Sequence, residues 1–420
     1  MRRYILSLIC VFSLSIFAFS QDDGHGHNDG HGHEQPAPSK GNDLGCGHPE
    51  EAAFDPGATA FHHISDQNIY NIGPWSLPLP CFLYAPDQGW SVFSSGKFHT
   101  DEHGHGNGHV AVDGYVLIDG MVHRIAEQGF PMGEVEVINH GFHLTETLDN
   151  GKVKNVPAVC YSDKLWKAEA RSTADGGLFG GGITSFYDFS LTKNVVTMII
   201  VFVLLAWLFI SVANKYKERR GMAPKGAQSF IETMFVFIQD EVAKPFLGHH
   251  WEKFLPFLMS LFFFILGLNL FGQVPFLGGS HVTGNLAVTA VLAIITFIVV
   301  NINGNKHYWE HIFWMPGVPA WVKTILTPVE FLGIFIKPLT LMLRLFANIT
   351  AGHMVVVIFV GLIFLFGKGE WGPSLGASIG STLLTLFMMS IELLVAFIQA
   401  FVFTILTASY IGAATEEAHH

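Results

Sequence analysis

The sequence predicts an all-α membrane domain at residues 191–420, preceded by a small β-containing domain outside the cytoplasm. The 420-residue chain is 50% hydrophobic and only 14% charged, and its composition changes near residue 190. Before that point the chain is polar and rich in Gly and His; after it come long uncharged stretches at 195–213, 254–279 and 282–305. Each stretch has roughly the 20 residues that an α-helix needs to cross the hydrocarbon of a bilayer.

The first twenty residues have the pattern of a secretion signal. Two arginines precede an apolar run from Ile5 to Phe17, and small residues follow it. We expect a signal peptide at 1–20 that is cleaved before Gln21; the alternative is a membrane anchor that the protein retains. In both cases residues 21–190 lie outside the cytoplasm.

Three cysteines remain once the signal is removed: Cys46, Cys81 and Cys160. In an oxidising compartment this odd number allows one disulfide and one spare thiol. The sequence leaves the pairing open.

A Gly- and His-rich segment at 21–54 is expected to be flexible. Its Gly-His repeats contain His25, His27, His31 and His33. Such tracts can bind zinc, copper or nickel, so these four histidines are candidate metal ligands. The alternative, which we favour, is a weakly buffering tail without a metal site, because the intervening glycines fix no coordination geometry.

Residues 55–190 are predicted to form a small folded domain with its linker. Apolar runs on both sides of Asp119-Gly120 indicate a hairpin with a type I′ turn over 115–125. Residues 134–138 alternate like a further strand, and the Gly-rich stretch 173–186 is predicted to link this domain to the membrane. We find no catalytic constellation, so we do not expect the chain by itself to be an enzyme or to hold a cofactor.

Basic residues set the orientation of the first span. Five of them follow it directly: Lys215, Lys217, Arg219, Arg220 and Lys225. By the positive-inside rule this end is cytoplasmic, so the first span runs from outside to inside. The net charge of −11 argues against a nucleic-acid partner.

Five crossings are predicted from this orientation. An apolar repeat of helical period at 229–242 indicates an amphipathic helix on the cytoplasmic surface. Spans at 254–275 and 285–303 then run outward and back. The last apolar segments, 324–367 and 376–412, are longer than a perpendicular span requires. We therefore expect two long tilted helices joined by a short outer turn, with the C-terminus in the cytoplasm.

Polar residues are few in the last two helices: Glu330, Lys337, Arg344, Asn348, His353, Glu392 and Gln399. At about 100° per residue, the first four fall within about 40° of one another and form one stripe. His353 lies on the opposite side of the same helix. Glu392 and Gln399, two turns apart, share a face of the last helix.

The two helices run in opposite directions, which sets the depth of these residues. His353 and Glu392 belong to the outer half of the membrane, and Glu330 lies nearer the cytoplasm. Gln399 reaches the level of Arg344. Together they predict two partial polar routes with a cation between them.

Arg344 is the only formal charge between Lys337 and Lys368. An arginine keeps its proton at any reachable pH, and a charge at that depth is costly unless it faces a partner or a water-filled path. We therefore expect Arg344 to mark an ion path. The alternative is a structural ion pair with Glu392, which by itself adds little stability.

These residues and their neighbours resemble bacterial subunit a of the F-type ATP synthase, the stator channel of a rotary motor. The resemblance covers about 190–420. It is carried by Pro328-Val329-Glu330, the run from Lys337 to Asn348, Ala351-Gly352-His353, Gly267-Leu268-Asn269, the run from Gly284 to Thr289, and Glu392 followed by Gln399.

The resemblance implies a role for each site residue. Arg344 would be the essential stator arginine, and Asn348 and Gln399 its polar neighbours. His353 and Glu392 would line the outer half-channel; some members carry these two residues in exchanged positions, which suggests that they act as a pair. Glu330 would belong to the cytoplasmic half-channel. Further lining residues would be Asn269 and Asn285.

The resemblance also implies partners and location. They are a ring of c subunits, the b-subunit peripheral stalk and the bilayer of the bacterial inner membrane, with the N-terminal domain in the periplasm. A rotor carboxylate would lose its proton beside Arg344 and reload from the other half-channel. The family says nothing of residues 21–190, and the sequence leaves proton or sodium as the ion open.

The sequence also has to be weighed against two other functions. A proton-coupled secondary transporter with a metal-capturing outer domain would predict an internal repeat in the membrane half, and the sequence has none. A membrane-anchored scaffold would leave Arg344 without a purpose.

Overall fold

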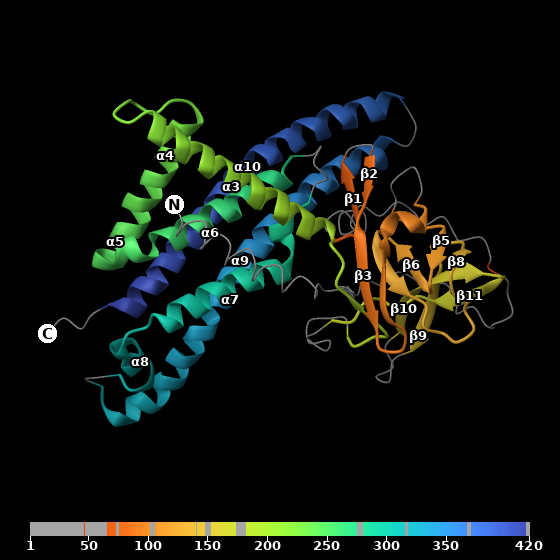
Figure 1. The fold of residues 1–420 in the computed structure, drawn as a ribbon, viewed down its shortest axis with the longest axis horizontal. Helices are drawn as coiled ribbons and strands as arrows, with labels where there is room; N and C mark the ends of the chain where they lie inside the picture. The colour runs from red at the N-terminus through yellow and green to blue at the C-terminus, as the bar shows by residue number, and fades with distance from the viewer. Residues whose placement is uncertain are drawn as a thin grey trace.

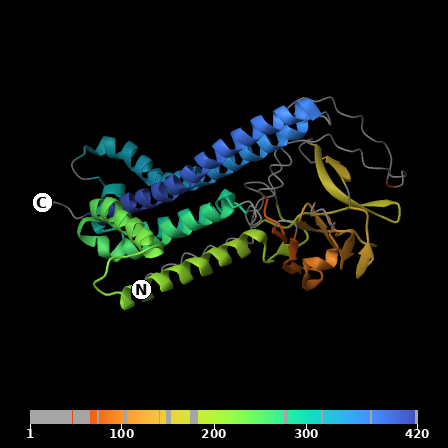
Figure 2. The same cartoon turned by 90° about the horizontal axis from the view of Figure 1, so that it is seen from above.

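The computed structural model describes residues 46, 65–72, 75–100, 106–139, 141–147, 153–173, 182–274, 280–315, 318–367 and 371–416. A β-rich outer domain lies at one end of a long helical domain (Figure 1 and Figure 2). The predicted signal peptide at 1–20 lies outside the described residues, and so do His25, His27, His31 and His33.

Short antiparallel strands build the outer domain. Its largest described sheet has the order β7 (Met121–Arg124), β6 (Tyr115–Ile118), β5 (Val110–Val112), β8 (Glu134–Glu136). Two three-stranded sheets have the orders β12 (Tyr187–Asp188), β3 (Pro80–Ala85), β4 (Gly89–Ser94) and β11 (Lys164–Lys167), β10 (Val153–Tyr161), β9 (His143–Thr147). A separate pair joins β1 (Ile69–Ile72) to β2 (Trp75–Pro78).

The predicted hairpin over 115–125 is confirmed. Strands β6 and β7 pair antiparallel with Ile118 opposite Met121. Asp119 and Gly120 both have positive φ, 51° and 80°, which is the type I′ geometry that the Asp-Gly pair favours. The strand expected at 134–138 is also present, as β8.

The cysteines form one disulfide and one buried thiol. Cys46 is bonded to Cys160, with their Cα atoms 6.0 Å apart. Cys81 is fully buried in β3, and burial, with the nearby Asp188 charge, raises the pKa of its thiol to about 12. A thiol in this setting is chemically inert until the domain unfolds.

The prediction that 173–186 is a linker was wrong for its last residues. Arg124 donates a hydrogen bond from its guanidinium to the backbone oxygen of Ser185, at 2.8 Å. Phe186 is fully buried in the core of the outer domain. Glycine content indicated a linker, but burying a phenylalanine favours a folded segment here, and β12 follows directly.

Helices fill the rest of the described chain: α3 (Lys193–Glu218), α4 (Ala227–Ile238), the π-helical turn η3 (Gln239–Ala243), α5 (Lys244–Leu247), α6 (Trp251–Gly272), α7 (Leu286–Ile302), α8 (Lys306–Phe313), α9 (Ala320–Gly367) and α10 (Trp371–Thr415). Four helical segments are long and apolar enough to cross a membrane, or five if α7 and α8, bent by 104°, form one span. The predicted fold class of this part of the chain, an α-helical membrane domain, is therefore confirmed.

The two long helices predicted at the end of the chain are present. α9 has 48 residues and α10 has 45, and the two run side by side along the length of the membrane domain (Figure 2). The connection between them is short, because α9 ends at Gly367 and α10 begins at Trp371.

The amphipathic helix predicted at 229–242 corresponds to α4 with η3. It leads into α5, which packs on the far end of α10 from the outer domain. The rings of Phe237 and Phe401 are 5.4 Å apart, and a side chain at Gly412 would overlap the backbone oxygen of Phe246.

Burial is uneven among the helices. In the segment that contains α6, 72% of the most apolar window is buried, against 17% in α9 and 28% in α10. α6 is thus the centre of the bundle, whereas α9 and α10 present apolar faces that no described part of the chain covers.

Candidate functional site

Most of the predicted site residues are carried by α9 and α10, which pack against each other. Near the outer domain, a Cβ added to Gly352 would lie 3.6 Å from Glu392 Oε1. Nearer the opposite end, Lys337 Nζ lies 5.6 Å from the centre of the Tyr410 ring. These two pairs fix the antiparallel register of the helices.

Arg344 and Asn348 lie between these pairs, on a side of α9 that the described chain leaves open. Asn348 is exposed and Arg344 half-buried, with Tyr410 within electrostatic reach of the guanidinium. Gln399 is buried on α10 and, by the register above, falls opposite the turn that carries Arg344.

The structure does not pair Arg344 with Glu392. Among the described residues, Glu392 Oε1 is buried without a hydrogen-bond partner, and the two side chains form no salt bridge. The alternative of a purely structural ion pair is therefore not supported. The guanidinium remains available to a group outside the chain.

Three titratable residues meet at the end of the membrane domain nearest the outer domain, and we call them the outer cluster: His281, His353 and Glu392. The rings of His281 and His353 are in contact, with their centres 3.7 Å apart and their planes tilted by 37°. One donor atom from each of the three lies within 4.8 Å of the others. Among the described residues this is also the one set of three such side chains spaced closely enough to share a metal ion. Donor atoms at this spacing can also pass a proton from one side chain of the outer cluster to another.

Close backbone packing holds His281 in the outer cluster. A Cβ at Gly272, at the end of α6, would lie 3.1 Å from His281 Nδ1. The backbone N–H of Gly284 donates to the backbone oxygen of His281 at 2.8 Å. The hydroxyl of Thr350 on α9 donates to the backbone oxygen of Gly284 at 3.2 Å. This turn therefore presses His281 against α9.

A small cavity lies between α7, α8, α9 and α10, on the opposite side of Arg344 from the outer cluster. It measures about 20 Å³ and is lined in part by Thr296, Asn301, Tyr308, Lys337 and Tyr410. Thr296 Oγ1 and Asn301 Oδ1 have no hydrogen-bond partner among the described residues. The cavity can hold about one water molecule.

Glu330 lies beside this cavity. It is half-buried on α9 and interacts electrostatically with Tyr308. The predicted inner carboxylate thus adjoins a polar cavity, whereas the predicted outer residues meet at the other end.

The side chains of Asn269 and Asn285 form hydrogen bonds that stabilise the fold around the outer cluster. The Asn269 amide donates to the backbone oxygen of Ala396 at 3.1 Å and accepts from the Thr283 hydroxyl at 2.6 Å. The Asn285 side chain accepts from the backbone N–H of Ala287 at 2.8 Å and caps α7. Through these bonds the two asparagine side chains hold the segments around the outer cluster in place. That they also line the outer half-channel stays a prediction.

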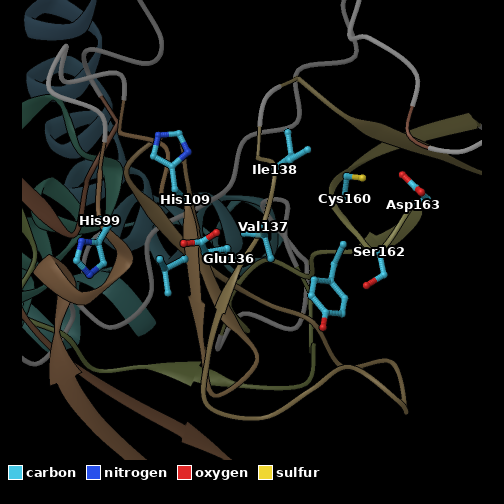
Figure 3. Close-up of a pocket in the computed structure, with 10 residues that line it drawn as sticks. His99, His109, Glu136, Val137, Ile138, Cys160, Ser162 and Asp163 are labelled. Carbon is cyan, nitrogen blue, oxygen red and sulfur yellow. The ribbon is translucent and has the colours of Figure 1, made fainter.

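A larger cavity lies elsewhere, in the outer domain. It measures about 690 Å³ and is lined by both polar and apolar groups. Figure 3 shows His99, His109 and Glu136 on one side of it and Cys160, Ser162 and Asp163 on the other. Among the described residues these side chains bring no three metal-binding donors together.

His281 was not predicted from the sequence as a site residue. The available signal was a single histidine between the otherwise uncharged stretches at 254–279 and 282–305. Thr296, Asn301 and Tyr308 of the inner cavity were missed as well, because isolated polar residues in apolar helices give no pattern.

Comparison with known proteins identifies relatives of the membrane domain. The family model described as ATP synthase A chain matches residues 195–412. A second family model, described as a domain of unknown function (DUF8433), matches residues 59–141 in the outer domain.

Individual relatives agree with the first family. The ATP synthase subunit a of Chloroherpeton thalassium is 41% identical over 240 residues, which is 56% of this chain and 69% of the relative. The ATP synthase subunit a of Myxococcus xanthus is 38% identical over 258 residues, which is 60% of this chain and 81% of the relative. The chain is thus similar to these proteins through its membrane domain.

Proposed function

The chain belongs to the ATP synthase A chain family, and from this premise we propose how its residues carry protons. It is the proton-channel subunit of an F-type ATP synthase and a multi-pass protein of the bacterial inner membrane. The alternative, a metal-capturing secondary transporter, finds no support among the relatives.

One observation carries the proposed mechanism. The fixed positive charge of Arg344 lies on the open side of α9, with the outer cluster toward one end of the helix pair and the polar cavity beside Glu330 toward the other. A protonated carboxyl group on a rotor subunit that reaches Arg344 is stabilised in its ionised form by the adjacent cation. The proton then leaves through one route, and the carboxylate is reloaded from the other after it has passed.

Arg344 also keeps the two routes apart. A proton that moved directly from the outer cluster to the inner cavity would have to pass the guanidinium, which repels it. Asn348 and Gln399 are polar neighbours that can solvate the rotor carboxylate without neutralising the arginine. Coupling to rotation follows, because only a moving carboxylate carries protons across.

The outer half-channel is assigned to His353 and Glu392. An imidazole suits a relay because an unperturbed histidine titrates at about pH 6.5. The inner half-channel is assigned to Glu330 with the cavity near Tyr308. Asn269 and Asn285 support the outer route by fixing α10 and α7.

The finer topology is part of the proposal. We place five crossings, with α7 and α8 as one bent span, the domain at 55–190 in the periplasm and the C-terminus in the cytoplasm. A signal peptide at 1–20 and a flexible segment at 21–54 would precede the outer domain, and the membrane domain would span 191–420. The b-subunit peripheral stalk would join the c ring as a direct partner.

Removing the cation tests this function. Arg344→Ala should abolish ATP-driven proton pumping in inverted membrane vesicles, because the rotor carboxylate would no longer be deprotonated, while the synthase still assembles. Lys323→Ala, which removes a cation near the start of the same helix, where its amine lies 4.4 Å from the centre of the Trp314 ring, is the matched control and should pump normally. Full pumping by an assembled Arg344→Ala synthase would refute the proposal.

A further inference from the structure

The outer domain docks on the first turn of α3 through buried polar residues. Asp66 Oδ1 accepts a hydrogen bond from the backbone N–H of Asn194 at 3.1 Å. The backbone oxygen of Gln67 accepts from the N–H of Lys193 at 2.8 Å. Asp66 is only 4% exposed. These bonds satisfy amides that the N-terminus of a helix leaves without partners, so the domain is tied firmly to the membrane helices.

Polar side chains lead from this junction to the outer cluster. The Ser280 hydroxyl donates to Asn194 Oδ1 at 2.7 Å, and both residues are 1% exposed. The ring of the next residue, His281, contacts the ring of His353. We call Asn194, Ser280 and His281 the polar seam. It connects the first turn of α3, on which the outer domain docks, to the outer half-channel on α9.

Polar atoms at the start of the seam are unsatisfied within the described chain. Among the described residues, Asn194 Nδ2 and Thr192 Oγ1 have no hydrogen-bond partner, although both residues are buried. Leaving a buried donor unsatisfied costs about 1–3 kcal/mol. Buried groups of this kind normally bind water, and a hydrated seam is what a proton route requires.

We propose that the outer half-channel continues from His353 through His281 and the polar seam, so that protons enter where the outer domain docks on α3. This inference rests on the proton-channel function proposed above. His281 takes up a proton on one ring nitrogen and releases one from the other toward His353 or Glu392, so its own charge is restored after each transfer. Asp66 is a positioning residue, because it holds the backbone of Asn194.

Substitution of His281 gives the first test. His281→Ala and His281→Gln should each lower ATP-driven pumping on the order of tenfold, less than the hundredfold or more typical of an acid–base group at a reacting centre, because water can replace an outer relay in part. Thr404→Ala, a buried control on α10 whose hydroxyl donates to the backbone oxygen of Ala400 in its own helix, should pump at the wild-type rate. Wild-type pumping by both His281 variants, in a system where Arg344→Ala pumps nothing, would overturn the inference and leave the channel function intact.

Accessibility of the seam gives a second, independent test on the assembled synthase. The His281→Cys variant should react with a membrane-impermeant methanethiosulfonate added from the outer side, and the reaction should block pumping. Thr404→Cys, at a fully buried position on α10, should stay unmodified. The free cysteine of the described residues, Cys81, is buried, so the background is low. A His281→Cys synthase that remains unmodified, or is modified without loss of pumping, would count against the seam.

Two variants of Asp66 separate positioning from proton carriage. Asp66→Asn keeps an oxygen acceptor for the Asn194 N–H and should pump close to the wild-type rate, whereas Asp66→Ala loses the acceptor and should pump several-fold more slowly. Wild-type pumping by Asp66→Ala, or equal losses in both variants, would overturn the positioning role.

Discussion

Fixed and titratable charges occupy different places in the membrane domain. Arg344, which cannot lose its proton, lies where the described chain leaves α9 open. His281, His353 and Glu392, which can exchange protons, are packed against one another at one end. In the proposed mechanism, the residue that repels protons is thereby kept away from the residues that pass them on.

The contact between His353 and Glu392 predicts that the pair acts as a unit. His353→Glu combined with Glu392→His should retain more proton pumping than either single change, because the exchange preserves one imidazole and one carboxyl group at the same contact. Gly352 leaves room for the rearrangement beside Glu392. Initial rates of vesicle acidification measure the effect. A double variant no faster than the slower single variant would disprove the pairing.

A buried histidine in the outer domain predicts a loss of stability in acid. His123 donates from Nδ1 to the Met121 backbone oxygen at 3.1 Å. Burial lowers its pKa below 6.5, helped by the Arg171 charge and opposed by the hydrogen bond to Met121 and by Asp119. As the pH falls, the unfolded chain therefore binds a proton before the folded domain does, so stability declines below about pH 6.5.

Reactivity of the Cys81 thiol can report this unfolding in the full chain. The temperature at which a fluorogenic maleimide labels Cys81 should fall between pH 7.5 and pH 5.5, on either side of the roughly 6.5 at which an unfolded histidine titrates. His123→Gln should reduce that pH dependence, whereas His143→Gln, at an exposed strand position, should leave it unchanged. An unchanged pH dependence in the His123 variant would contradict the assignment.

Among the elements, the approach of α5 to α10 is a helix contact that a side chain would break. Gly412→Ala should lower the stability of the purified chain in detergent by about 1–3 kcal/mol, the usual cost of forcing extra atoms into packed space. Gly380→Ala in the same helix meets nothing within 4 Å and should be neutral or stabilising, by up to about 1 kcal/mol, because alanine favours helix. Thermal unfolding midpoints compare the two, and equal shifts would show that α5 does not pack there.

How far the sequence predicted these elements depends on the range of the interactions. The long helices follow from apolar length, and the β6–β7 turn follows from Asp119-Gly120, because both signals are local. The position of His281 depends on glycines of two different segments that let the turn approach α6 and α9, and no local period encodes that. In the sequence, Asn269 in an apolar helix is compatible with lining a channel or with a structural hydrogen bond. Its hydrogen bonds to Thr283 and Ala396 show the structural role, and both partners come from elsewhere in the chain.

For the whole molecule, the open faces of α9 and α10 determine where a partner can bind. Leu339 and Leu343 are 50% and 46% exposed, and lipid chains alone would cover them adequately. Lipid would leave Arg344 and Asn348 in hydrocarbon, which is costly for charged and amide groups. A partner with its own polar group at that depth is therefore favoured, and a rotor carboxyl group provides one.

The preference for a polar partner over lipid beside Arg344 and Asn348 predicts selective crosslinking in the intact synthase. Asn348→Cys labelled with a benzophenone maleimide should crosslink to a c subunit on illumination, because the rotor would lie against that side of α9. Trp207→Cys on α3 is the matched control: Trp207 is 68% exposed but lies on another helix, so its probe should react with lipid only. Mass spectrometry of the crosslinked bands distinguishes the products. Equal crosslinking from both positions would mean that the ring does not select the face that carries Arg344, and the proposed transfer of protons beside this arginine would then lose its geometric basis.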